Sequence, residues 1–414
     1  MEPLSKRDKK RHSFCYLKIK RPFLKLLSFF ILCFLPLSLW GELSLKDAKA
    51  LIIDNSYRGF SLINDHDKVY TFSYSALQKK DSDPTLDAIR YFKQLQLNDN
   101  KTLSMKVMGK NKKVFEKELH FFMGTQDIKA KIVNDNYIFL TARTARGELK
   151  IALLDQTYNI RFTQSIKNYS IKKIYNIFSH LDGSYSLALK VSNHKNSLSY
   201  FKRGTGKNNI AILKFSPLLH LIQTHFIGDT YITNTFKILK DKEDIYYIFN
   251  QNKKDKLTLY KHDFHKNDNE KFEFTLQSPY RFNTASSRDF SNFYLGADKN
   301  SWMTLNIESK NLDVFELAKV KHGSIKSISI LPNNSILVSG KHRSSSGESD
   351  IFIHNYSPYK SFLWGHTFHS DFNDQVINHK YKHQNIFLTT LVTDKKNQTQ
   401  LAFFKLNFSG KVYK

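Results

Sequence analysis

Four histidines near the C-terminal end of the chain have spacings that could hold a metal ion. They are His366, His369, His379 and His383, and the two pairs enclose two and three residues. Such spacings can bring imidazoles together on turns or helices, but on a strand the first pair would point to opposite faces, because side chains alternate. No Asp, Glu or Cys completes a set at clear spacing. We therefore interpret them as solvated surface histidines and predict no metal site.

Carboxylates gather in the same part of the sequence. Asp371 and Asp374 lie in a predicted turn, and Glu348 and Asp350 are near them in sequence. Paired carboxylates can act as general acid and base when their environments separate their pKa values. Turn aspartates more often accept hydrogen bonds from backbone N–H groups, and we favour this structural role. The G-x-S-x-G nucleophile elbow is absent from the sequence.

Two short motifs match functional loops only in part. In RGTGKNN, residues 203–209, Asn208 stands where a phosphate-binding loop needs Ser or Thr, and Phe201 stands where its first Gly belongs. ADKNSW, residues 297–302, is similar to the Asp-box turn of sialidases, but its Asp-to-Trp spacing is one residue short and no second copy is evident. We therefore predict no nucleotide site, and we name no catalytic, cofactor-binding or metal-ligating residue.

The N-terminal segment has the pattern of an export signal. Residues 1–25 hold nine Lys/Arg against Glu2 and Asp8, and residues 26–40 follow without a charge. A spanning helix needs about 20 apolar residues, whereas the apolar region of a signal peptide needs roughly 7 to 15. We interpret residues 1–41 as a signal peptide cleaved after Gly41 or, alternatively, as a retained anchor. Both alternatives place residues 42–414 outside the cytoplasm, in the periplasm or at the cell surface.

Cysteine usage and charge limit the chemistry of the body. Cys15 and Cys33 are the two cysteines, so residues 42–414 have no disulfide, thiolate metal site or cysteine nucleophile. The formal net charge is +27, of which residues 1–25 contribute +7 and the rest of the chain +20. A basic field of this size attracts polyanions. Because Lys is spread along the body without a Lys/Arg block, we expect no specific nucleic-acid partner.

The elements that would position any site form a repeat. Seven short runs rich in aromatic and β-branched residues, each followed by a polar turn, begin at Lys68, Tyr137, Tyr185, Ile245, Phe293, Ser335 and Asn385. A second run of the same kind follows each of them, beginning at Ile89, Leu149, Asn209, Lys256, Ser301, Asp350 and Gln400. Runs of this kind are typical of strands, and most offsets lie in the range of roughly 40 to 50 residues that four-stranded propeller blades need.

This spacing predicts an all-β fold: a single β-propeller, most consistent with seven blades of four antiparallel strands, over residues 42–414. The seven runs of the first kind are interpreted as inner strands. Six or eight blades remain alternatives, because the first repeat is long and residues 193–209 form a polar insertion, interpreted as a surface loop. A strand near residues 49–54 would join the last blade and close the ring, which protects the edges of both end strands.

The segment ILVSGKHRSSSGESDIFIHNYSPYKSFLWGHTF places Gly340 at the end of a strand and Gly347 in a Ser/Gly-rich hairpin. Asp350 and a second strand follow, and then Trp364 in a closing strand. This pattern, over residues 327–411, resembles the repeat of many secreted or surface-attached bacterial β-propellers. The resemblance implies architecture and export, and it implies no reaction, because fold alone does not give function.

The absence of a credible catalytic set favours a non-catalytic exported propeller. It would act as a protein-binding or envelope-scaffold module, with another envelope protein or a cell-surface component as partner, and would meet the membrane only through an uncleaved N-terminal segment. One alternative is an enzyme for a glycan or peptide, with a site assembled from several blades at the channel mouth. Its residues would lie about 45 positions apart, beyond the reach of local motifs. The other alternative is electrostatic binding of an anionic polymer. No cofactor is predicted.

Overall fold

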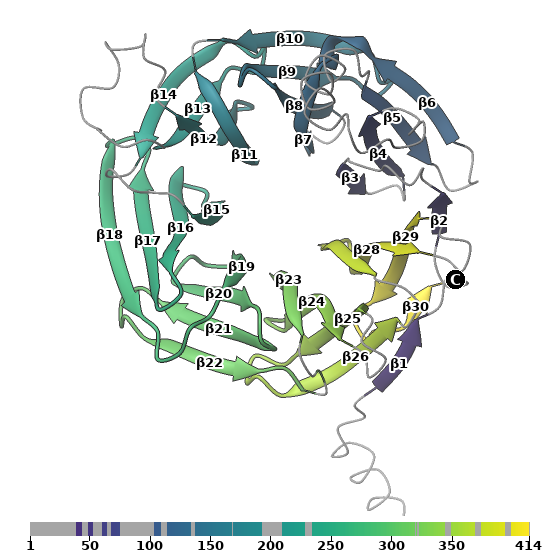
Figure 1. Cartoon of the computed structure of the whole chain (residues 1–414), viewed down its shortest axis with the longest axis vertical. Helices are drawn as coiled ribbons and strands as arrows, with labels where there is room; N and C mark the ends of the chain where they lie inside the picture. Colours follow the sequence, from purple (N-terminus) through teal and green to yellow (C-terminus); the bar gives the residue numbers. More distant parts are fainter. Residues whose placement is uncertain are drawn as a thin grey trace, which may run out of the picture.

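The computed structural model describes residues 39–43, 49–52, 60–63, 68–74, 103–108, 114–133, 137–167, 169–192, 209–227, 234–318, 320, 323–343, 349–368, 374–393 and 399–413. These residues form seven sheets, each built on four strands, arranged in a ring around a central axis (Figure 1). Apart from the short 3-10 helix η4 (His120–Phe122), their regular elements are strands. The predicted all-β propeller of seven blades is confirmed.

The strands follow one another blade by blade. Blade one consists of β3 (Phe60–Ile63), β4 (Val69–Tyr74), β5 (Leu103–Met108) and β6 (Val114–Leu119). Blade two consists of β7 (Thr125–Val133), β8 (Tyr137–Thr144), β9 (Leu149–Leu154) and β10 (Ile160–Ile166). Blade three consists of β11 (Ser170–Ser179), β12 (Tyr185–Ser192), β13 (Asn209–Phe215) and β14 (Leu221–Ile227). Blade four consists of β15 (Thr235–Lys240), β16 (Ile245–Lys253), β17 (Lys256–Asp263) and β18 (Asp268–Thr275). Blade five consists of β19 (Phe282–Ser287), β20 (Asn292–Ala297), β21 (Ser301–Asn306) and β22 (Leu312–Glu316). Blade six consists of β23 (Ser324–Ile330), β24 (Ile336–Arg343), β25 (Ser349–Tyr356) and β26 (Phe362–Phe368). Blade seven contains β27 (Gln375–Lys382), β28 (Asn385–Thr393) and β29 (Thr399–Asn407), together with β2 (Lys49–Ile52) and β30 (Val412–Tyr413).

Blades one to six run from the axis to the rim in sequence order, with β3, β7, β11, β15, β19 and β23 nearest the axis in Figure 1. The seven runs interpreted as inner strands are therefore second strands, from β4 to β28, and that part of the prediction was wrong. Second and third strands lie between other strands of their sheet and between neighbouring blades. They are the most buried elements, as the first five residues of β12 illustrate, and this burial explains their strong apolar signal.

The first blade differs from the prediction in one strand. Its third strand is β5, whereas the sequence pattern favours the run from Ile89. The run from Ile89 lies outside the described residues, as do residues 193–208 of the predicted insertion. Asn209 is the first residue of β13.

Two N-terminal strands pair with the last two blades. β2 lies antiparallel to β29, with Lys49 opposite Phe403 and Ile52 opposite Gln400, and so supplies a fourth strand to the seventh blade. β30 pairs with β29 beside it. β1 (Leu39–Leu43) lies parallel to β26 at the rim of the sixth blade. The seventh blade thus joins both ends of the described chain, which removes an open edge from the ring.

The innermost strands share a β-bulge in their pairing with the second strand. The extra residues are Lys172 and Tyr175 in β11, and Phe236, Asn283, Lys326 and Ile377 in β15, β19, β23 and β27. In β7, Asp127 and Ile128 lie opposite Ala142. A bulge bends the strand and increases its twist. The residue that follows the bulge, or in β11 the first of its two bulges, is here named the post-bulge residue.

The apolar core lies between adjacent blades. At the interface of blades two and three, the rings of Phe139 and Tyr185 pack with centroids 5.1 Å apart inside a cluster drawn from both blades. Between blades five and six, Trp302 is fully buried, with its ring 6.1 Å from that of Tyr356. Each blade thus buries its apolar faces against its neighbours, as in other repeat architectures. Within the described part of the chain, no helix has the length and apolar character needed to cross a membrane.

Candidate binding face on the third and fourth blades

Two of the four clustered histidines are buried between the last two blades. The His379 ring lies 2.6 Å from the Ser339 hydroxyl through Nδ1 and 3.0 Å from the Ser329 hydroxyl through Nε2. His366 donates a hydrogen bond from Nε2 to the Gly410 carbonyl. The interpretation of both residues as solvated surface histidines was therefore wrong, because each bridges blade six to blade seven.

The histidines do not assemble a metal site in the described structure. His383 is exposed in the turn between β27 and β28, and His369 lies outside the described residues. Within the described ranges, no three His, Cys, Asp or Glu side chains gather closely enough to hold a metal ion.

The described members of the carboxylate group are buried. Asp374 and Asp350 are buried, at 0 % and 1 % exposure, and the Asp374 N–H donates to the carbonyl of Ser349. Asp371 and Glu348 lie outside the described residues. The two described members therefore do not form an exposed acid–base pair.

The structure describes only one of the two partial motifs in full. In ADKNSW, the Asp298 carboxylate accepts a hydrogen bond from the Arg281 N–H at 2.8 Å, and the Asn300 side chain accepts one from the Gly323 N–H. Both are structural links at the start of β19 and β23. RGTGKNN lies outside the described residues except for Asn209.

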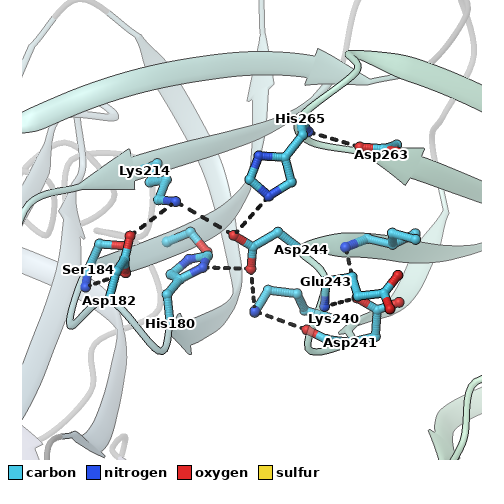
Figure 2. A network of polar contacts seen from close by, with 12 residues as sticks. His180, Asp182, Ser184, Lys214, Lys240, Asp241, Glu243, Asp244, Asp263 and His265 are labelled. Atoms are coloured by element: carbon cyan, nitrogen blue, oxygen red, sulfur yellow. Dashed lines mark hydrogen bonds and ion pairs between the residues drawn. The ribbon is translucent and has the colours of Figure 1, made fainter.

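A polar network joins the third and fourth blades on one face of the ring (Figure 2). His180 follows β11, Ser186 lies on β12, and Asp244 and Tyr246 lie at the start of β16. His180 Nδ1 is 2.7 Å from Asp244 Oδ1, and His180 Nε2 is 2.9 Å from Ser186 Oγ. The Tyr246 hydroxyl lies 2.7 Å from the same Oγ. A continuous line of hydrogen bonds therefore crosses the blade interface.

The order Ser186, His180, Asp244 has the geometry of a nucleophile, base and orienting acid. Burial lowers the pKa of His180 more than its carboxylate partner raises it, so the ring is neutral, donates Nδ1–H to Asp244 and accepts from Ser186. Burial raises the pKa of Tyr246, whose O–H is therefore free to donate to Ser186. Ser186 is fully buried. The network therefore braces two blades and presents no hydroxyl to a substrate.

Two lysines balance the acidic groups of the network. The Lys240 ammonium lies 2.6 Å from Asp244 Oδ1, and the Lys214 ammonium bridges Asp244 and Asp182 at 3.5 Å and 3.6 Å. His265 Nε2 approaches Asp244 Oδ2 at 3.7 Å from the turn after β17. Burial alone would raise the pKa of Asp244, but the hydrogen bond from Lys240 and the surrounding positive groups outweigh it and hold that pKa below its usual value.

Large apolar side chains are exposed beside this network. Leu181, in the turn between β11 and β12, is 95 % exposed, and Leu218, in the turn between β13 and β14, is 53 % exposed. Both turns lie at the same end of the blade, because successive strands alternate in direction. They also adjoin, since a Cβ on Gly183 would lie 3.6 Å from Pro217. We call Leu181 and Leu218 the blade-three leucine pair.

A polar pocket of about 550 Å³ opens between blades four and five. Its lining comes from the β15–β16 and β19–β20 turns and from the residues around them, namely Asp241, Lys242, Glu243, Ile245, Tyr247, Lys261, Arg288, Asp289, Phe290, Ser291, Ile307 and Glu308. Acidic and basic groups alternate in it. The face of blades three to five therefore combines exposed leucines, charged turns and a hollow.

Comparison with known proteins places the chain by its fold. No protein family and no curated protein sequence matches it. A chain of a solved structure described as "Crystal Structure of Mitotic Checkpoint Complex" is similar over 87 % of this chain and 91 % of that one, with a TM-score of 0.50 and 11 % identity. The chain is a β-propeller. Since 1008 chains of solved structures match, this likeness identifies the fold and no particular function.

Sequence reasoning missed the residues of the propeller's charged network. His180 and Asp244 are 64 residues apart, and Ser186 and Tyr246 are 60 apart. Only the ring brings them together. The available signal is that Ser186, Asp244 and Tyr246 lie at or directly before the start of predicted strands in consecutive repeats.

Proposed function

We propose that this propeller is a non-catalytic binding module whose partner is a protein. The observation that carries the proposal is the blade-three leucine pair, since Leu181 is 95 % exposed on adjoining turns of a rigid sheet. Exposed apolar side chains rimmed by charged groups are typical of protein interaction sites. Asp182 and Lys214 supply such a rim. A solved chain of similar fold belongs to a multiprotein complex, which is compatible with this role.

The proposed setting is the bacterial envelope, with another envelope protein or a cell-surface component as partner. Support comes from the basic residues 1–25, the uncharged residues 26–40 and the repeat pattern over residues 327–411. Cleavage after Gly41 would remove three of the five residues of β1. N-terminal sequencing of the protein from its native cells tests this setting, and a mature chain that still begins at Met1 in the cytoplasm would contradict it.

Crosslinking in the native cells tests the binding proposal. The double variant Leu181→Asp/Leu218→Asp removes the exposed apolar pair. Leu363→Asp, at a side chain that is 38 % exposed on β26, is the matched control because it adds a charge elsewhere on the ring. After crosslinking and purification, quantitative mass spectrometry should find at least one protein that the wild type and Leu363→Asp capture and the double variant loses. Identical sets for all three proteins would contradict the proposal.

A further inference from the structure

Positive charge in this protein concentrates on the strands nearest the axis. The seven innermost strands hold two lysines each in β7, β11, β15 and β27 and one in β23, nine in all, against the single acid Asp127. The fourth strands of blades one to six instead hold seven acidic and three basic residues. The basic composition of the whole chain therefore does not account for the axial lysines, since the rim strands show the opposite balance.

Three of these lysines follow a bulge on three consecutive blades. They are Lys129 in β7, Lys173 after the first of the two bulges of β11, and Lys237 in β15, whereas Asn176 follows the second bulge of β11. In blades five to seven, the post-bulge residues are Thr284, Ser327 and Asn378, which are polar and uncharged. Lysines therefore follow a bulge only on blades two to four.

Direct contacts hold two of the basic strands, β7 and β11, side by side. The Ile174 N–H of β11 donates to the Asp127 carboxylate of β7 at 3.0 Å, and the Lys131 ammonium of β7 donates to the Ile177 carbonyl of β11 at 3.2 Å. The Asp127 carboxylate also lies 3.5 Å from Arg143 Nε. The one acid of the innermost strands is thus already shared among other donors.

The axial lysines reach solvent and repel one another. Lys173 and Lys380 are exposed, and Lys129, Lys131 and Lys237 are half-buried. Burial lowers the pKa of Lys131 to about 8, and the charges of Lys380 and Lys240 act in the same direction. Burial and the charge of Lys129 likewise lower the pKa of Lys237. The ammonium groups of blades two, four and seven therefore act on a common space.

We propose that the lysines around the axis bind a compact anion carrying several phosphate groups. We call the site, defined by Lys129, Lys131, Lys173, Lys237 and Lys380, the axial lysine site. Phosphate groups concentrate negative charge and acceptor oxygens in a small volume. Lysine ammonium groups bind them as compact point charges with several donors. The axial lysine site is separate from the blade-three leucine pair, and its test does not depend on a protein partner.

Isothermal titration of the full chain with sodium tripolyphosphate tests the site, at about 150 mM NaCl so that diffuse surface attraction is screened. The wild type should bind one anion per chain. Lys173→Gln/Lys237→Gln should weaken that binding roughly tenfold or more, because two of the point charges are lost. Since these substitutions relieve repulsion, the variant should unfold at the same temperature as the wild type or a higher one, so a loss of binding cannot be assigned to misfolding.

The matched control removes the same charge elsewhere. Lys256→Gln/Lys271→Gln, on β17 and β18 of blade four, should leave the affinity within about twofold of the wild type. Equal weakening by both double variants, several anions bound per chain, or no saturable binding would each overturn the proposal. A hexa-aspartate peptide forms the second arm. If it binds the same site more tightly than tripolyphosphate, the proposed phosphate chemistry is wrong.

Discussion

Buried histidine provides polar links between blades where other blades use apolar contact. His379 directly follows the post-bulge residue of β27, and the residues at the equivalent place in β11, β15 and β23 are Ile174, Ile238 and Ile328. His379 remains compatible with this position because Ser329 and Ser339 satisfy both ring nitrogens. Burial favours the neutral ring, because the two hydroxyls carry no negative charge that would offset an imidazolium.

This arrangement predicts acid sensitivity. Burial lowers the pKa of His379 to about 3, with Lys237 acting in the same direction, from an ordinary value of 6.5. The folded pKa lies below the unfolded one, so the stabilisation is complete above about pH 6.5 and is lost as pH falls toward 3. At pH 5 the loss amounts to about 2 kcal/mol. Urea unfolding at pH 7.5 and pH 5 should show that His379→Gln loses this part of the pH dependence.

A second variant tests whether His379 itself causes the acid sensitivity. His379→Ile reproduces the residue found at the equivalent position of β11, β15 and β23, and it also removes the titrating group. If both variants lose as much stability between pH 7.5 and pH 5 as the wild type does, His379 is not the source of the acid sensitivity. Some acid sensitivity should persist in both, because burial and then His262 lower the pKa of His225 to about 4.

Asp244 is the residue on which the charged network depends. Asn at this position tolerates the backbone φ of 62° and keeps the side-chain shape, but it removes the negative charge that Lys240 and Lys214 share. Lys214 keeps Asp182 as a partner, but the largely buried Lys240 loses its carboxylate. Leaving a buried charge without its partner costs about 3 kcal/mol. Asp244→Asn should therefore lower the free energy of unfolding by that order at pH 7.5.

The control for Asp244 is another turn aspartate. The Asp263 carboxylate accepts hydrogen bonds from the N–H groups of His265 and Lys266, which the carbonyl of an Asn side chain can also accept. Asp263→Asn should therefore change the free energy of unfolding much less than Asp244→Asn does. Equal losses for the two variants in urea unfolding would show that the inter-blade charge network adds no stability of its own.

At the scale of elements, the sequence predicts the buried strands far better than the others. β8, β12 and β28 stand out as apolar runs because neighbouring blades and strands cover them. Innermost strands such as β11 and β27 carry Lys at positions that face solvent or follow a bulge, so they have no regular alternation. The repeat length thus predicts the number of blades, whereas the place of each run within its blade depends on tertiary contacts.

The candidate sites show the same limit. The axial lysine site draws on β7, β11, β15 and β27, and each strand contributes one or two lysines that read as ordinary surface residues. Charge composition alone gives a basic chain without a patch. Only the ring order gathers these lysines around the axis.

The closing strand offers a test at this scale. β2 pairs with β29 through residues 49–52, so a chain that begins at residue 55 leaves the outer edge of Gln400–Phe403 unpaired. Loss of this pairing should cost about 2 kcal/mol and lower the melting temperature by roughly 3 °C. The exposed edge should also promote self-association. A chain that begins at residue 45 keeps β2 and serves as the control; equal melting temperatures for the two chains would contradict a closing role.

At the scale of the whole molecule, charge opposes ring closure. The formal charge is +27, and nine lysines are held on the innermost strands. Like charges held near one another destabilise a compact state by self-repulsion. The apolar interfaces between blades therefore have to offset a repulsion that is greatest at the centre of the ring.

Raising NaCl from about 20 mM to about 500 mM should therefore raise the melting temperature, because salt screens this repulsion. Lys237→Met should raise the melting temperature at low salt and reduce its dependence on salt, since it removes one charge from the axis. Lys256→Met, at an exposed position on β17, removes the same charge away from the axis and should change the salt dependence less. Calorimetry on the three proteins measures both effects. A melting temperature that falls with salt would mean that ion pairs such as Lys240–Asp244 outweigh the axial repulsion. The arrangement of basic innermost strands and acidic fourth strands would then stabilise the ring.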